Sequence, residues 1–126
     1  MMVQLYEVLY WIGLILFGGY FVYNGVRHFI YHSGMAGYAG AMGVPQPSMA
    51  VYVSGALLVL GGMGLILNFY THVALWLLVV FLVPVTLKMH AFWKTSDPAA
   101  RMSSEINFYK NMALLGAVFM LMYLIG

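Results

Sequence analysis

Residues 49–89 decide the fold class: they read MAVYVSGALLVLGGMGLILNFYTHVALWLLVVFLVPVTLKM. Until Lys88 this stretch contains no charged residue, and the short break NFYT at 68–71 divides it into two apolar runs. A helix of about 20 apolar residues is needed to cross a hydrocarbon layer about 30 Å thick. The stretch therefore predicts two membrane-spanning helices, at about 49–67 and 72–89, which are antiparallel neighbours because their connection is so short.

Two further apolar runs flank this pair. Charge-free runs cover residues 8–26 and 111–126. Together with the polar and aromatic residues at their ends, they predict spans at about 6–29 and 106–125. No Lys or Arg precedes the first run, so we expect a membrane helix there rather than a cleaved signal peptide. We therefore expect an all-α integral membrane protein whose single transmembrane domain, residues 1–126, is a four-helix bundle.

The composition of the whole chain agrees with this fold class. Hydrophobic residues make up 64% of the 126 residues and charged residues only 6%, against about a quarter charged in an ordinary soluble domain. A net charge of +2 without a basic run gives no reason to propose nucleic-acid binding. The absence of cysteine excludes disulfides and thiol chemistry by this chain. The partner that the composition requires is the lipid bilayer.

The cations all fall at one end of the predicted bundle. Arg27 ends the first span, and the other four lie in or beside the connection between the third and fourth spans: Lys88, Lys94, Arg101 and Lys110. Short loops rich in Lys and Arg tend to remain in the cytoplasm. We therefore expect a multi-pass protein of the cell membrane with both termini on the non-cytoplasmic side.

The two longer connections differ in character. Residues 31–48, YHSGMAGYAGAMGVPQPS, carry no charge and contain small residues at helical spacing. We expect a short interfacial or re-entrant helix here, ended at Gly43 and the prolines that follow. In the second connection Asp97 precedes Pro98, which is typical of a helix N-cap. This pattern predicts a short separate helix at 98–102, ahead of the fourth span.

Polar side chains gather at the cytoplasmic ends of three predicted spans. They are Asn24, Arg27 and His28 of the first span, Thr86, His90 and Trp93 at the end of the third, and Lys110 and Asn111 of the fourth. Polar groups at this depth normally face the bundle interior or water, because exposing a charge to lipid costs up to about 3 kcal/mol. Their convergence predicts a ligand-binding pocket that opens to the cytoplasm. The alternative is that the cations extend to lipid head groups while the amides cap helices.

The histidines are poorly arranged for a metal or a haem. His28 and His32 are four residues apart, but Ser33 and Gly34 suggest that the helix ends at His32. A haem with two histidine ligands would need one from each of two helices at matching depth, and only His28 and His90 could form that pair. We therefore expect neither a metal site nor a haem site.

Six blocks of the sequence, taken in order, resemble the DoxX family. They are NGVRHF at 24–29, GVPQP at 43–47, SGALLVLGG at 54–62, FLVPVTLKMHAFW at 81–93, DPAAR at 97–101 and FYKNMALLGA at 108–117. The family comprises small four-helix membrane proteins that are distantly similar to the DoxD subunit of archaeal thiosulfate:quinone oxidoreductase. The resemblance implies a membrane subunit linked to redox chemistry near the quinone pool.

On this basis we expect the predicted pocket to bind a quinone or another small lipophilic molecule. A quinone requires a flat apolar slot and donors to its two carbonyl oxygens. The candidate donors are Arg27, His28, His90, Lys110 and Asn111, and the candidate slot residues are Phe92, Trp93 and Tyr109. Because no motif in the chain holds a redox cofactor, catalysis would need a membrane or membrane-associated protein partner. The alternatives are a non-catalytic structural or assembly subunit of a larger membrane complex, and a small-molecule carrier built as a homo-oligomer.

Overall fold

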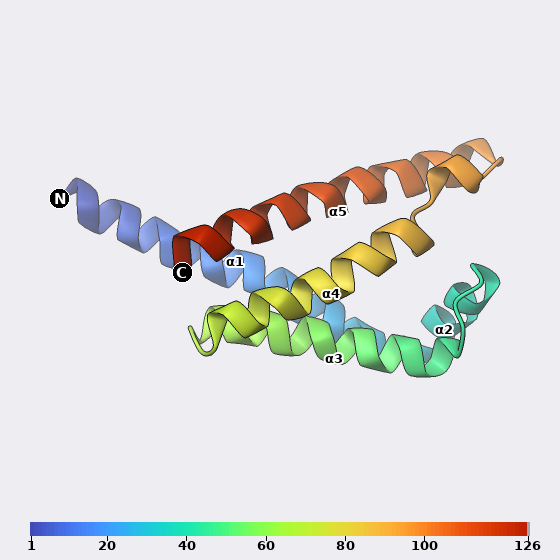
Figure 1. The fold of residues 1–126 in the computed structure, drawn as a ribbon, viewed down its shortest axis with the longest axis horizontal. Helices are drawn as coiled ribbons and strands as arrows, with labels where there is room; N and C mark the ends of the chain where they lie inside the picture. The colour runs from blue at the N-terminus through green and yellow to red at the C-terminus, as the bar shows by residue number, and fades with distance from the viewer. Residues whose placement is uncertain (126) are drawn as a thin grey trace.

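The computed structural model describes residues 1–125, and the regular structure in this part of the chain is helical (Figure 1). The elements are α1 (Met2–Ile30), α2 (His32–Ala41), α3 (Pro47–Ile66), α4 (Thr71–Met89), the 3-10 turn η1 (Phe92–Lys94) and α5 (Pro98–Ile125). Among the described residues, α1, α3, the segment from Thr71 through η1, and α5 are long and apolar enough to cross a membrane. The prediction of an all-α membrane bundle is therefore confirmed.

The helix at the start of the fourth span differs from the prediction. The separate helix expected at 98–102 is wrong, because these residues form the first turns of one continuous helix, α5. The N-cap itself was located correctly: the Ala100 amide donates to the Asp97 carboxylate at 3.0 Å, and the Arg101 amide donates to the Asp97 carbonyl at 2.8 Å. No Gly or Pro follows until Gly116, so nothing in the sequence interrupts the helix once it has begun.

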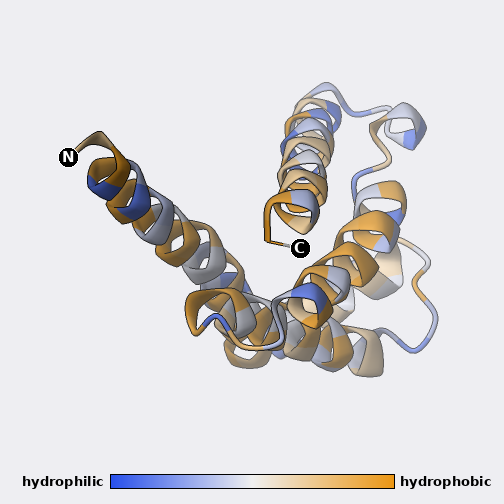
Figure 2. Ribbon diagram, turned by 60° about the vertical axis from the view of Figure 1, so that its left-hand side comes forward, coloured by the Kyte–Doolittle hydropathy of each residue, from blue (hydrophilic) through white to orange (hydrophobic). Residues whose placement is uncertain are grey.

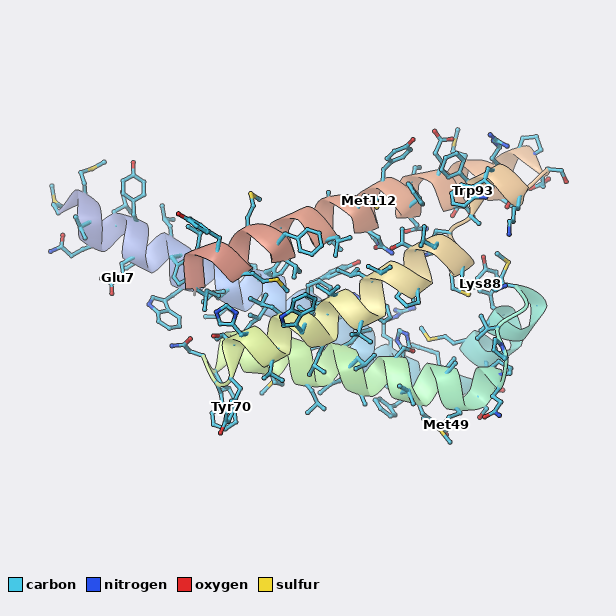
Figure 3. All side chains as sticks on the ribbon, in the orientation of Figure 1. Glu7, Met49, Tyr70, Lys88, Trp93 and Met112 are labelled. Carbon is cyan, nitrogen blue, oxygen red and sulfur yellow. The ribbon has the colours of Figure 1, made fainter. Side chains whose placement is uncertain are left out.

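The connections define two ends of the molecule, which we call the turn end and the basic end. The turn end holds the N-terminus of α1, the turn between α3 and α4, and the C-terminus of α5 (Figure 1). The basic end holds α2, η1 and the start of α5. Figure 3 shows Glu7 and Tyr70 at the turn end, with Lys88 and Trp93 at the basic end.

The predicted helix between the first two spans is present as α2. It packs on α3, and the His32 ring stacks on the Tyr52 ring with centroids 3.7 Å apart. The Nε2 atom of His32 also hydrogen-bonds the Ser48 carbonyl oxygen at 2.9 Å. After α2 the chain turns at Gly43, whose φ of +84° lies in the region that glycine adopts without strain. These contacts hold α2 against the start of α3.

α1 and α3 pack through paired glycines. A Cβ atom added at Gly18 would lie 2.7 Å from the Gly62 carbonyl oxygen, and one added at Gly25 would lie 2.8 Å from the Gly55 carbonyl oxygen. The pairs are seven residues apart on both helices, in opposite chain directions, so they lie along one antiparallel seam. Small residues let the backbones approach closely, which favours helix association in a membrane.

α4 packs on a different face of α3, and this pairing also uses glycines. A Cβ atom at Gly61 would lie 2.7 Å from the Leu78 side chain, and one at Gly64 would lie 2.6 Å from the Ala74 Cβ atom. The tight turn before α4 places Asn68 and Tyr70 at positive φ, 53° and 48°. α3 is thus the central helix, with glycines on the face that meets α1 and on the face that meets α4.

α5 packs on α4 and η1, so the long helices form a row in the order α1, α3, α4, α5. In Figure 2 α1 and α5 stand apart at the two ends of this row. Side chains from all four helices form the core: Phe21, Leu58, Leu65, Leu75, Leu78, Leu82 and Val118. Large apolar side chains remain exposed on the outer faces, among them Leu16, Trp76 and Met120. Such surfaces require lipid contact, so the chain is a multi-pass membrane protein.

Candidate functional site

An open groove of about 430 Å³ lies between α1 and α5, the two helices at the ends of the row. Its wall consists of Gly13, Leu16, Phe17 and Tyr20 of α1 together with Lys110 and Leu114 of α5. All of these side chains except those of Lys110 and Tyr20 are entirely apolar. The groove is therefore a lipophilic surface with a single cation in its wall.

Lys110 reaches across this groove. Its Nζ atom lies 5.7 Å from the centroid of the Tyr20 ring, and it donates to the Asn107 side-chain oxygen at 3.3 Å. Lys110 is twelve residues after Pro98, which corresponds to about 18 Å along the helix axis. The ammonium group is thus well inside the length of α5, four residues after Ile106, where the apolar run begins. The Tyr20 ring and the Asn107 side chain stabilise its charge there.

The polar side chains at the end of α1 mostly bond within their own helix. The Asn24 amide donates to the Tyr20 carbonyl at 2.8 Å, and His28 Nδ1 hydrogen-bonds the Asn24 carbonyl at 2.7 Å. The Arg27 guanidinium lies over the Tyr31 ring at 5.0 Å and donates to the Tyr23 hydroxyl at 3.2 Å. Arg27 is therefore held among exposed aromatic residues of the outer surface, in a position suited to the membrane interface.

The residues at the end of α4 have different surroundings. Thr86 is buried, with 3% of its surface exposed, and His90, the residue after α4, is partly exposed. Trp93 lies on η1 with its ring 5.5 Å from that of Phe108, and about half of its surface is exposed. The aromatic contacts of η1 therefore attach the connection to α5.

Comparison with known proteins identifies the family. The DoxX family model matches residues 12–91, which are 80 of the 126 residues of the chain. The chain belongs to the DoxX family. No curated protein and no solved structure gives a further match. The matched range covers most of α1 and all of α2, α3 and α4, so the α1 wall of the groove falls inside the DoxX match and the α5 wall falls outside it.

The DoxX chain brings some of the predicted site residues together and leaves others apart. Lys110 approaches α1 at Tyr20. His28 approaches α4, where its ring centroid lies 6.0 Å from that of Phe81. Of the eight predicted residues, Lys110 is the one that lines the α1–α5 groove. Asn111 follows it on α5 and is buried, with 5% of its surface exposed.

Sequence reasoning missed the apolar wall of this groove. Gly13, Leu16, Phe17 and Tyr20 follow one another at spacings of three, one and three, which places them on one face of α1. That spacing shows that the four residues share a face. It does not show what the face meets, because this part of α1 is apolar all round and periodicity cannot distinguish a groove from lipid or another helix.

The histidines of the DoxX chain are engaged in ways that separate them. Tyr31 interrupts the helix, so His28 lies in the last turn of α1 while His32 begins α2. One ring nitrogen of each is hydrogen-bonded to a backbone carbonyl, that of Asn24 for His28 and that of Ser48 for His32. Within residues 1–125, no three His, Asp or Glu side chains are grouped closely enough to hold a metal ion.

Proposed function

We propose that this DoxX-family protein binds a quinone, or another lipophilic small molecule with a hydrogen-bond-accepting head group, in the groove between α1 and α5. The observation that carries this proposal is the position of Lys110, a cation in the wall of a groove whose other side chains, apart from the Tyr20 hydroxyl, are apolar. The groove volume of about 430 Å³ falls within the range of about 300–1,000 Å³ typical of small-molecule sites.

The wall offers the two kinds of contact that a quinone head group needs. A lysine ammonium has three donor hydrogens, and Asn107 accepts a bond from this group, which leaves donor capacity for a quinone carbonyl oxygen. The Phe17 and Tyr20 rings line the same groove and supply flat apolar surface. Leu16, another wall residue, is 69% exposed, so a ligand can enter from the lipid and keep its tail in the bilayer.

The other predicted residues have secondary places in this proposal. His90 and Asn111 do not line the groove. Asn111 is buried, with 5% of its surface exposed, and would support α5 from within the bundle. The remaining members, Asn24, Arg27, His28, Thr86 and Trp93, would shape the surroundings toward the basic end. A redox role would use a protein partner, which would exchange electrons with the bound quinone.

The chain has no cysteine, so single introduced cysteines test this proposal directly. We expect a short-chain ubiquinone or menaquinone analogue to slow maleimide labelling of Leu16→Cys in purified protein. Leu60→Cys is the matched control, because Leu60 is 60% exposed on α3 and lies outside the groove. Lys110→Met in the Leu16→Cys background should weaken this protection roughly tenfold, as expected for loss of a hydrogen bond to a charged donor. Arg101→Met, which removes a cation outside the groove, should leave it unchanged.

The same experiment distinguishes quinone binding from a structural or assembly role. The open flank of α1 supports the second role because a partner chain could pack against it. If Leu16→Cys is protected in native membranes more strongly than the lipid-facing control Leu60→Cys, becomes reactive in the purified protein, and is not protected again by any analogue, a partner chain covers the groove. Equal labelling of Leu16→Cys with and without analogue in the purified protein would contradict the quinone proposal. Equal protection of the wild-type and Lys110→Met backgrounds would contradict the role given to Lys110.

We further propose that the protein lies in the cell membrane with its basic end in the cytoplasm. The support is the position of Lys88, Lys94 and Arg101 at that end. In intact cells an impermeant maleimide should label Phe69→Cys, in the α3–α4 turn, and should label Ser96→Cys only after permeabilisation. The reverse pattern would place the basic end outside.

A further inference from the structure

A second groove lies at the basic end, between the end of α2 and the connection from α4 to α5. Its volume is about 420 Å³. The end of α2 forms one side, and the residues of the other side that matter here are Leu87 and Lys88 of α4, Lys94 of η1, and Thr95, Ser96 and Asp97 before α5. Unlike the α1–α5 groove, it combines an apolar wall with several polar side chains, and the quinone proposal makes no use of it.

The charges in this groove leave a net positive site. Lys88 extends from α4 toward the chain after α2, since its Nζ atom would lie 3.4 Å from a Cβ atom added at Gly43 (Figure 3). Lys94 supplies a second ammonium group from η1. The acid in the wall, Asp97, accepts a hydrogen bond from the Ala100 amide and so caps α5. Two cations against one engaged carboxylate, with the hydroxyls of Thr95 and Ser96 nearby, favour an anion that accepts several hydrogen bonds.

An apolar strip leads from this groove along α4. Leu87 lines the groove, and Val83 and Val80 precede it by four and seven residues, on the same face of the helix. The exposed fractions of Val80, Val83 and Leu87 are 54%, 38% and 56%. The strip therefore runs from the basic end along α4 and is left exposed by the other described helices.

We propose that this groove binds the head group of an anionic phospholipid, with the phosphate against Lys88 and Lys94 and one acyl chain along the Val80–Val83–Leu87 strip. Basic pockets beside membrane-spanning helices recognise anionic head groups through this combination of charge and depth. Phosphate oxygens are the shared chemistry of lipid and free phosphate. The adjoining apolar strip favours the lipid, because a free anion would make no use of it.

Lipid retention tests this site in the full-length protein. Purified protein is equilibrated with mixed micelles of phosphatidylglycerol and phosphatidylcholine, and the retained lipids are measured by native mass spectrometry. Wild type should retain phosphatidylglycerol preferentially. The double variant Lys88→Gln/Lys94→Gln should reduce that preference roughly tenfold, whereas Lys88→Arg/Lys94→Arg should keep most of it. Arg101→Gln is the control, because it removes one positive charge at the same end. Its lipid retention is compared with that of Lys88→Gln and of Lys94→Gln.

Each outcome decides the proposal. Selective loss in the Gln variants, with retention in the Arg variants and in Arg101→Gln, supports the site. Equal losses in Arg101→Gln and in the single Lys→Gln variants would show a general charge effect and would overturn it. Displacement of phosphatidylglycerol by millimolar inorganic phosphate alone would assign the groove to a free anion. Failure of the quinone experiment would leave this result unaffected, because the two grooves share no wall residue.

Discussion

Two faces of α1 differ sharply in how closely they are approached. On the α3 side, a Cβ atom at Gly18 would lie 2.7 Å from a backbone oxygen of Gly62. On the α5 side, a Cβ atom at Gly13 would have no neighbour within 4 Å, and Gly13 lines the open groove. The helix thus carries glycines in two roles only five residues apart. One allows backbone contact with another helix, and the other leaves space.

This difference indicates where the molecule can accept a ligand. The α1–α3 seam has no spare volume, because backbone and small side chains already meet there. The α1–α5 groove is bordered instead by side chains such as Lys110 and Leu114, and α3 and α4 come between the two helices in the row. In a membrane such an open flank is filled by lipid, by another chain or by a lipophilic ligand.

The largest effect is expected from adding a single methyl group where α1 and α3 approach most closely. Gly18→Ala should lower the free energy of unfolding by about 1–3 kcal/mol, because the new Cβ atom would force two backbones apart. Gly19→Ala is the adjacent control, since a Cβ atom there has no neighbour within 4 Å. It should change the unfolding free energy by less than about 0.5 kcal/mol. Unfolding by SDS in mixed micelles measures both, and equal stability of the two variants would contradict the close seam.

A substitution in the groove should affect stability less than one in the seam, but it should clearly weaken ligand binding. Gly13→Leu should leave the fold intact because the position is open, and the new side chain should occupy part of the groove. The affinity for a quinone analogue should fall roughly tenfold, through loss of a contact surface of that size. Gly116→Leu, also open but outside the groove lining, is the control. Fluorescence titration measures the affinity of the three proteins for the analogue. If Gly13→Leu binds it as tightly as wild type does, the groove is not the binding site.

Much of the fold was predictable because hydropathy depends on residue type alone. The charge-free stretch between Arg27 and Lys88 includes the first connection, all of α3 and nearly all of α4, and its hydropathy alone predicts the two membrane helices. The Asp97–Pro98 pattern located the start of α5 because a cap is a local hydrogen-bonding arrangement. The predicted end of the helix at 102 was wrong because the change from polar to apolar residues, which follows Glu105, does not break a helix.

The candidate site was predictable only in part. The spacing of Asn24 and His28 predicts a shared face of α1. Both residues take part in hydrogen bonds within that helix, so the spacing alone does not show that they bind a ligand. Lys110 was found because a cation inside an apolar run is unusual in any context. Its aromatic neighbour, Tyr20, could not be found in this way, because α1 carries aromatic residues on several faces.

The sequence by itself therefore determined that this is an all-α membrane protein with four long apolar helices, and that its cations gather toward one end. Those properties follow from the cost of moving each residue from water into hydrocarbon, a sum over residues that needs no tertiary contact. The tertiary structure alone decided the order of the helices in the row and the open flank between α1 and α5. The order of the helices depends on which helix packs against each glycine-containing face of α3. Such packing is a property of a pair of helices and cannot be deduced from either helix alone.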